Sequence, residues 1–336
     1  MTTKIGINGF GRIGRQVFKA VRDFYPDILE VVAVNDIGDV PTMAHLLKYD
    51  SILGRLGRDV QASGDSLTVD GHSFAALAVR NPAELPWGDL GADIVIESTG
   101  IFTDAEKAKA HLDAGAKKVI ISAPASNEDI TIVMGINDHL YDPNTHHLVT
   151  AASCTTNSLA PVVKVLHESV GIERGSITTI HDVTNTQVIV DAPHNDLRRA
   201  RSALQSLIPT STGSATAITL IYPELAGKLN GLAVRVPLLN ASLTDAVFTV
   251  KEDVTVDQIN GLFEDASTGA LKGILGYETR PLVSADFVND PRSGIVDALS
   301  TMVIDSRMVK VLIWYDNEYG YAFRMADLAA KVAATL

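Results

Sequence analysis

Cys154 is the only cysteine in the 336-residue sequence, and its neighbours are small or carry hydroxyl groups: residues 151–157 read Ala-Ala-Ser-Cys-Thr-Thr-Asn. They precede a helix-like stretch at 157–170, in which Pro161 suits an early turn better than a long straight helix. Unpaired amides at a helix N-terminus stabilise a thiolate and a developing oxyanion. A buried core cysteine is the alternative, because free cysteine is among the most buried residue types. The hydroxyl-rich surroundings favour a nucleophile.

A thiol nucleophile requires a base, and the sequence contains nine histidines. His181 follows a β-branched run at residues 177–180, and the end of a strand is a common place for a catalytic side chain. Helix-like or loop-like stretches, where surface or packing roles are usual, contain His45, His111, His146, His147 and His167. From the residue pattern, His181 is the best of several candidates.

A cluster of arginines, Arg198, Arg199 and Arg201, interrupts an acidic chain. A solvated helix face is the ordinary explanation of such a cluster. A second feature favours anion binding: residues 209–214 read Pro-Thr-Ser-Thr-Gly-Ser, a turn whose hydroxyls and amides suit a phosphate. Arg235 stands within an apolar strand-like run and therefore needs an anionic partner, for which a phosphate group qualifies.

Gly9, Gly11 and Gly14 form a Gly-x-Gly-x-x-Gly motif between an expected strand and an expected helix, and Asp36 follows 22 residues after Gly14. This context indicates a dinucleotide site, with a tight turn at Gly9, a close backbone approach to a pyrophosphate at Gly11 and close helix–strand packing at Gly14. Asp36 can accept hydrogen bonds from ribose hydroxyls and would repel a 2′-phosphate, so NAD is favoured over NADP. A glycine-rich turn without a ligand is the alternative.

Strands and helices must position these residues. The first third of the chain alternates short β-branched runs with helix-like stretches, which predicts a parallel sheet with helices on both faces. The expected strands lie at 4–8, 29–34, 94–96 and 118–122, the helices at 12–24, 43–49 and 105–114, and a hairpin at 66–79.

After about residue 150 the runs become longer and richer in β-formers, which predicts an α+β domain with a mixed or antiparallel sheet. The expected strands lie at 176–184, 231–237, 242–250 and 310–315, and the helices at 157–170, 199–207 and 255–270. An Ala-rich amphipathic run at 321–336 predicts a C-terminal helix. The fold class is therefore α/β plus α+β: a Rossmann-type parallel-sheet domain and a second, catalytic α+β domain.

The composition and charge of the chain argue against several classes of function. The net charge of −12 makes nucleic acid an improbable partner. No apolar run reaches the length of a membrane span, and the N-terminus lacks the apolar block of a signal peptide. One cysteine allows neither an internal disulfide nor a Cys-based zinc site, so we expect no metal and a soluble protein of the reducing cytoplasm.

The motifs together resemble the glyceraldehyde-3-phosphate dehydrogenase family over essentially the whole length, and Ser-Cys-Thr-Thr-Asn is highly specific to that family. The matching segments are residues 7–15 around the glycine motif, His-Leu-Leu-Lys-Tyr-Asp-Ser at 45–51, Glu-Ser-Thr-Gly at 97–100, Ser-Cys-Thr-Thr-Asn at 153–157, Pro-Thr-Ser-Thr-Gly at 209–213 and Trp-Tyr-Asp-Asn-Glu at 314–318.

At matching positions the resemblance implies Cys154 as the nucleophile and His181 as its base. It implies substrate or anion contacts from Ser153, Thr155, Thr184, Arg199, Thr212, Gly213 and Arg235. It implies NAD contacts from Gly9, Gly11, Arg12, Ile13, Gly14, Asp36, Arg80, Ser122 and Asn317.

The resemblance also implies an NAD-binding domain over residues 1–152, on which a C-terminal helix at 318–336 packs back, and a catalytic domain over 153–317. The family is a glycolytic homotetramer in which a segment near Pro193 reaches toward a neighbouring subunit's cofactor. NADP-using photosynthetic relatives carry a serine at the position of Pro193, which again favours NAD.

The implied reaction oxidises glyceraldehyde 3-phosphate. The Cys154 thiolate attacks the aldehyde, His181 takes a proton as hydride passes to NAD, and a thioester remains. Inorganic phosphate then releases an acyl phosphate, so one difficult reaction becomes two easier ones.

The sequence departs from the family pattern at several positions. Ser158 stands where a second cysteine is frequent, Asp182-Val183 replaces a small residue and Tyr, Thr186 stands where bacterial relatives often carry Asp, and Leu238-Leu239 replaces Thr-Pro. The run at 181–187, His-Asp-Val-Thr-Asn-Thr-Gln, resembles a subgroup from arsenate-resistance cassettes, which would use arsenate as the attacking oxyanion and form 1-arseno-3-phosphoglycerate.

Three alternatives remain open. Erythrose-4-phosphate dehydrogenase shares an Asp-Leu-Arg-Arg segment such as residues 196–199 but hydrolyses its thioester. A semialdehyde dehydrogenase shares the cysteine and nicotinamide chemistry but not the Ser-Cys-Thr-Thr-Asn segment. A non-catalytic NAD-binding regulator would have no physical need for Cys154, His181 and the arginines together.

Overall fold

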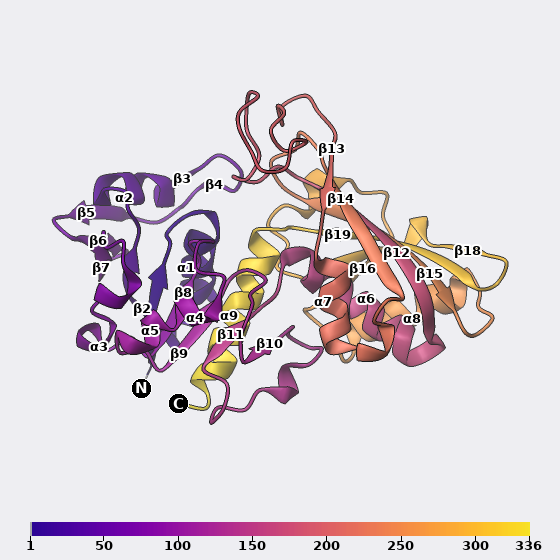
Figure 1. The fold of residues 1–336 in the computed structure, drawn as a ribbon, viewed down its shortest axis with the longest axis horizontal. Helices are drawn as coiled ribbons and strands as arrows, with labels where there is room; N and C mark the ends of the chain where they lie inside the picture. Colours follow the sequence, from indigo (N-terminus) through magenta and orange to yellow (C-terminus); the bar gives the residue numbers. More distant parts are fainter. Residues whose placement is uncertain (1) are drawn as a thin grey trace. The chain divides into compact units, whose positions relative to one another are not determined.

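The computed structural model describes residues 2–336 (Figure 1). The chain divides into two compact units. The first contains the residues up to Ser153 together with Ala322–Leu336, and the second is Cys154–Tyr321.

The first unit is built on a sheet that has nine strands within residues 2–336, in the order β10-β11-β9-β8-β1-β2-β7-β6-β5. All pairings from β10 to β7 are parallel, and only the β7-β6-β5 edge is antiparallel. The parallel sheet and the hairpin at its edge confirm the predictions. The strands are β1 (Thr3–Asn8), β2 (Leu29–Asn35), β5 (Val60–Ser63), β6 (Ser66–Val69), β7 (His72–Leu77), β8 (Ile94–Glu97), β9 (Lys118–Ile121), β10 (Ile130–Thr131) and β11 (Leu148–Thr150).

Helices and a small two-stranded ladder accompany this sheet: α1 (Arg12–Phe24), α2 (Val40–Lys48), α3 (Trp87–Leu90), α4 (Ala105–Ala108), α5 (Ala110–Asp113), and the pair β3 (Tyr49–Asp50) and β4 (Gly54–Arg55). In α1, Val17, Phe18 and Val21 recur at helical spacing and are buried, as the sequence pattern predicts.

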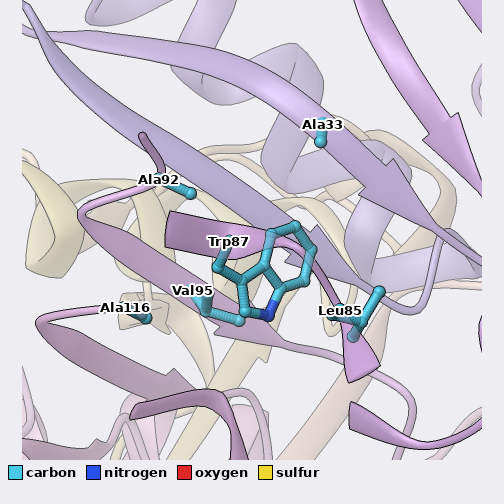
Figure 2. Close-up of a cluster of buried hydrophobic side chains, with 6 residues drawn as sticks. All are labelled: Ala33, Leu85, Trp87, Ala92, Val95 and Ala116. Atoms are coloured by element: carbon cyan, nitrogen blue, oxygen red, sulfur yellow. The ribbon is translucent and has the colours of Figure 1, made fainter. Parts of the chain in front are cut away.

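A tryptophan fills the space between these elements. Trp87 is fully buried among Ala33, Leu85, Ala92, Val95 and Ala116 (Figure 2). Gly6 of β1 makes room for it, because a Cβ at that position would lie 2.6 Å from the Trp87 ring. The small residues around the indole ring therefore fix the packing of α3 against the sheet.

A buried polar chain joins this core to the strand ends. Trp87 Nε1 donates to His111 Nδ1 at 3.0 Å, and His111 Nε2 lies 2.9 Å from a Glu97 carboxylate oxygen. Glu97 also accepts from Asn8 Nδ2 at 2.6 Å and from the Thr99 amide at 2.8 Å. His111 is thus a packing residue, as expected, and the chain fixes the ends of β1 and β8 where the glycine motif begins.

The C-terminal residues belong to the same unit. In α9 (Tyr319–Ala333), Lys331 pairs with Asp138 at 2.9 Å, and the Tyr25 hydroxyl donates to Asp327. The rings of Phe24 and Phe323 meet edge to face with centroids 4.6 Å apart.

The second unit contains a mixed sheet in the order β13-β14-β12-β15-β19-β17-β16, with β18 paired to β19. The pairs β12–β14 and β16–β17 are parallel, and the others are antiparallel. The strands are β12 (Ile172–His181), β13 (Ile208–Ser211), β14 (Leu229–Arg235), β15 (Ser242–Val250), β16 (Leu275–Glu278), β17 (Gly294–Asp297), β18 (Met302–Ile304) and β19 (Met308–Tyr315).

Three helices accompany this sheet: α6 (Cys154–Val170), α7 (Ser214–Ile221) and α8 (Val256–Thr268). Helix α6 packs on β15 and β17 and is flanked by α7 and α8. The mixed sheet confirms the predicted α+β character of this half of the chain.

Some predicted elements were wrong. Residues 199–207 form turns rather than a helix, because Asp191 and Asp196 accept backbone N–H groups of Ser202 and Arg198 and hold the chain in tight bends. The first half of the turn expected at 209–214 lies in strand β13, and the helix expected at 105–114 divides at Lys109 into α4 and α5.

Helix α6 differs in length from its prediction. It begins at Cys154 rather than at residue 157 and continues through Pro161 to Val170. Eleven of its residues are buried, so tertiary packing offsets the hydrogen bond that an internal proline removes.

Candidate active site

Cys154 is the first residue of α6 and is half-buried, so the lone thiol lies at a helix N-terminus, as predicted. Two residues earlier, Ala152 has a φ of +58°, in the left-handed region. Such a conformation costs a non-glycine residue about 1 kcal/mol or more, and it occurs preferentially at functional sites. The backbone leading into the thiol is thus held in an uncommon bend.

His181 lies beside this thiol. It ends β12, and its Nε2 is 3.6 Å from Cys154 Sγ. The side chain is buried, and the Tyr315 ring meets it edge to face with centroids 6.1 Å apart. Burial alone would lower the pKa of His181, but hydrogen bonds with Asp182 and Cys154 and the negative charge at Cys154 raise the pKa to about 9. A protonated imidazole is therefore favoured beside the thiol.

Arg235 completes this group, and the strand register explains its position. Strands β12 and β14 pair in parallel with His181 opposite Arg235. Arg235 Nη1 lies 2.6 Å from His181 Nδ1 and donates to the Asp182 carbonyl at 3.1 Å. Its Nε is buried and has no hydrogen-bond partner within residues 2–336, which leaves one strong donor for an anion.

Arg199 faces the same region. Its Nε donates to Thr210 Oγ1 at 2.9 Å, and that hydroxyl donates to Asp196 at 2.7 Å. Arg199 lies near enough to Arg235 for its charge to contribute to lowering the pKa of Arg235, although burial is the larger cause. Two guanidinium groups so placed favour a bound anion, which would offset their repulsion.

Thr212 and Gly213 lie at the start of α7. Thr212 Oγ1 is 3.0 Å from Ser214 Oγ, and no atom lies within 4 Å of where a Cβ on Gly213 would be. This gives hydroxyl groups and open backbone in front of a helix that starts at Ser214.

The remaining residues expected to contact substrate are placed differently. Ser153 directly precedes the thiol. Thr184 closes a turn three residues beyond His181, where its amide and hydroxyl both donate to Gln187. Thr155 is buried, and its hydroxyl is 2.9 Å from the Tyr315 hydroxyl. The side chain of Thr155 thus faces the core of the second unit.

Tyr315 is a residue that the sequence analysis missed. Its hydroxyl joins Thr155 of α6 to Thr179 of β12, at 2.9 and 2.7 Å. Burial raises its pKa, and the nearby Cys154 adds to that effect. The signal was its place in the Trp-Tyr-Asp-Asn-Glu segment, but only the structure shows that it ties the two catalytic elements together.

In the first unit, the glycine motif forms the loop between β1 and α1. Gly9 has a φ of +91°, and a Cβ there would lie 2.5 Å from the Thr99 amide nitrogen. A Cβ on Gly14 would lie 2.0 Å from the Gly9 carbonyl oxygen. Gly11 differs, because the space that its Cβ would fill is empty. This open place at the N-terminus of a 13-residue helix fits a pyrophosphate.

The other residues expected to contact the cofactor lie near the ends of neighbouring strands. Asp36 follows β2 and accepts the Phe10 amide at 2.8 Å, Arg80 is exposed beyond β7, and Ser122 follows β9. Parallel strands bring these ends to one edge of the sheet, where ligands of such folds bind.

Arg12 and Asn317 show different contacts. Arg12 Nη1 pairs with buried Asp50 at 2.8 Å. The next residue, Ile13, is half-buried in the first turn of α1. Asn317 lies in the second unit, where its amide donates to Asp182 at 2.8 Å and accepts from Ser242 at 3.0 Å.

Two kinds of feature are absent from residues 2–336. No group of three or more His, Cys, Asp or Glu side chains is arranged to hold a metal ion. No helix there is both long and apolar enough to cross a membrane.

Comparisons with known proteins agree with this geometry. Residues 3–105 match the family model "Glyceraldehyde 3-phosphate dehydrogenase, NAD binding domain", and residues 153–317 match "Glyceraldehyde 3-phosphate dehydrogenase, C-terminal domain". The chain is 58% identical to glyceraldehyde-3-phosphate dehydrogenase of Geobacillus stearothermophilus over 334 residues, 99% of each chain. It is 57% identical to glyceraldehyde-3-phosphate dehydrogenase 3 of a Nostoc species over 338 residues, all of each chain. The chain belongs to the glyceraldehyde-3-phosphate dehydrogenase family.

Proposed function

We propose that this chain is an NAD-dependent, phosphorylating glyceraldehyde-3-phosphate dehydrogenase. The observation that carries the proposal is the group formed by Cys154, His181 and Arg235, in which a thiol, a base and a guanidinium meet at a helix N-terminus. A protein that only bound NAD would have no use for this arrangement.

The first half of the reaction uses the thiol and the imidazole. The Cys154 thiolate attacks the aldehyde carbon, a C–S bond forms, and the carbonyl oxygen takes the electron pair and then a proton from the His181 imidazolium. His181 next removes that proton as the carbon is oxidised to a thioester. NAD, when bound, supplies the hydride acceptor.

The second half requires an anion. An oxyanion of phosphate attacks the thioester carbon, the C–S bond breaks, and the Cys154 thiolate leaves with the electron pair. Arg199, Arg235, Thr212 and Gly213 are proposed to hold the phosphate groups, because they supply paired guanidinium, hydroxyl and backbone donors. Ser153, Thr184 and the backbone of Thr155, whose side chain faces the core, complete the proposed substrate contacts.

The proposed NAD site lies on the glycine loop. Gly9, Gly11 and Gly14 admit the pyrophosphate, and Asp36 retains one carboxylate oxygen for ribose hydroxyls while the other accepts the Phe10 amide. Arg12, Ile13, Arg80, Ser122 and Asn317 are the further proposed contacts. A carboxylate at position 36 opposes a 2′-phosphate, which supports NAD rather than NADP.

NADH formation from glyceraldehyde 3-phosphate and NAD tests the proposal in three parallel assays: without oxyanion, with phosphate and with arsenate. We expect sustained turnover only when an oxyanion is present. Sustained turnover without either anion would mean that water resolves the thioester, as in erythrose-4-phosphate dehydrogenase. No NADH in any assay, with NAD still bound, would contradict the proposed function.

The same assays test a finer proposal, that arsenate is the physiological acceptor. It rests on the run at 181–187, which resembles the subgroup from arsenate-resistance cassettes. Arsenate and phosphate have nearly the same shape and charge, so the rates must distinguish them. A higher kcat/KM with arsenate supports the proposal, and equal values count against it.

We also propose a homotetramer. Large apolar side chains are exposed along one segment of the second unit: Ile189, Val190, Leu197, Leu204 and Leu207, of which Leu197 is 82% exposed. So many exposed apolar side chains along one segment are typical of a surface that another chain covers. Light scattering is expected to give four times the chain mass, and a monomer would contradict the proposal.

A further inference from the structure

A buried carboxylate stands on the side of His181 away from the thiol. Asp182 follows β12 directly and is 1% exposed. Its Oδ1 lies 2.6 Å from His181 Nδ1, while Cys154 Sγ lies 3.6 Å from Nε2. The imidazole ring thus lies between a thiol and a carboxylate, in the order that nucleophile, base and acid take in a catalytic triad.

The carboxylate has its own supports. Asn317 Nδ2 donates to Asp182 Oδ2 at 2.8 Å, and Ser242 Oγ lies 3.4 Å from Oδ1. The Asp182 amide donates to Ser242 Oγ at 3.2 Å. These contacts fix the rotamer of Asp182 and satisfy a charge that would be costly to bury without partners.

The groups around Nδ1 determine which ring nitrogen carries the proton. Two acceptors face Nδ1, the Asp182 carboxylate at 2.6 Å and the Asp182 carbonyl at 2.9 Å. One donor also faces it, Arg235 Nη1 at 2.6 Å, and this group has an alternative acceptor in the Asp182 carbonyl at 3.1 Å. A hydrogen on Nδ1 therefore satisfies the carboxylate, which has the stronger attraction for it. The other charged or titratable groups facing the ring are Cys154 and Tyr315.

We propose that Asp182 is a positioning residue that keeps a proton on His181 Nδ1 and holds the imidazole plane so that Nε2 faces Cys154. The inference rests on the proposed function, in which His181 is the base. A small residue at position 182, which is more usual in the family, would leave Nδ1 with the backbone carbonyl as its only acceptor in this group. Asp182 therefore adjusts the proton affinity and orientation of His181 rather than creating the base.

The test compares Asp182→Asn and Asp182→Ser with the wild-type protein. Asp245→Asn is the matched control, because Asp245 is a carboxylate of β15 that pairs with Lys310 at 2.7 Å. The His181 imidazole is titrated by ¹⁵N NMR and assigned with a His181→Gln protein. The alkylation rate of Cys154 by iodoacetamide is measured over the same pH range.

We expect both Asp182 variants to titrate His181 about one to three pH units lower than the wild-type protein does. We expect kcat to fall by roughly tenfold or more while KM for the aldehyde changes little, and Asp245→Asn to match the wild type. Because Asn preserves shape and Ser does not, agreement between them assigns the effect to the lost charge.

The proposal is overturned if His181 titrates as in the wild type in either variant that folds. Asp182 would then serve only to hold Asn317 and Ser242. If the wild-type protein forms no NADH, that result contradicts the proposed function but not the role of Asp182, because the titration and alkylation measurements do not require turnover.

Discussion

Replacing Cys154 with Ala is expected to abolish NADH formation, with a loss of more than about 10⁴-fold in kcat. No other thiol exists in the chain to form a thioester. The side chain is only half-buried and lies at the first position of α6, so its truncation leaves the helix packing intact. The measurement is initial-rate NADH absorbance with phosphate at saturation.

The control moves the thiol by four residues. Ser158 lies on α6 with its hydroxyl donating to the Thr155 carbonyl, and it is buried. In the double variant Cys154→Ala, Ser158→Cys the chain has one thiol again, but this thiol replaces a buried side chain that faces the backbone of its own helix rather than His181. We expect neither turnover nor rapid alkylation in that protein. Activity in either variant would show that the thioester mechanism is wrong.

NAD binding separates a lost nucleophile from a lost fold. The proposed NAD contacts other than Asn317 lie in the first unit, so Cys154→Ala should show the same rise in Tm with NAD as the wild-type protein. A variant that no longer responds to NAD would point to a structural defect and would have to be set aside in favour of Cys154→Ser.

Local patterns predicted those parts of the site that depend on neighbours in sequence. The glycine motif, the thiol at a helix start and the base at a strand end each rest on a few adjacent residues, because turn geometry and helix termini are local properties. The two sheets followed from apolar periodicity for the same reason.

The contacts of the site that the sequence did not predict depend on pairing between distant strands. Arg235 meets His181 only because β12 and β14 align in one register, and Tyr315 reaches Thr155 across 160 positions of sequence. Asp182 was noticed only as a departure from the family pattern, since its contact with His181 depends on a side-chain rotamer held by Ser242 and Asn317. The turns at 199–207 were not predicted because Asp191, which lies outside that stretch, accepts the backbone N–H group of Ser202.

Replacing His181 with Gln is expected to lower kcat by roughly 10²- to 10⁴-fold, because a neutral amide can hydrogen-bond to the thiol but cannot exchange a proton with the substrate oxygen. Alkylation of Cys154 at neutral pH should slow in parallel, since the imidazolium that favours the thiolate is gone. The matched control is His167→Gln, because His167 is a histidine of α6 that pairs with Glu224 at 3.0 Å, away from the thiol. Wild-type turnover in His181→Gln would exclude His181 as the base.

The same variant should change how stability depends on pH. The pKa of His181 is raised from 6.5 to about 9 in the folded protein, so the folded state holds a proton that the unfolded chain releases near its ordinary pKa. The stabilisation from this proton is therefore complete below pH 6.5 and is lost as the pH rises through about 9. Its upper limit is roughly 3 kcal/mol, and the coupling to Cys154 means that part of it belongs to the pair. Urea unfolding across this pH window should show a decline in the wild-type protein that is absent in His181→Gln, and parallel curves for the two proteins would show that no such proton is held.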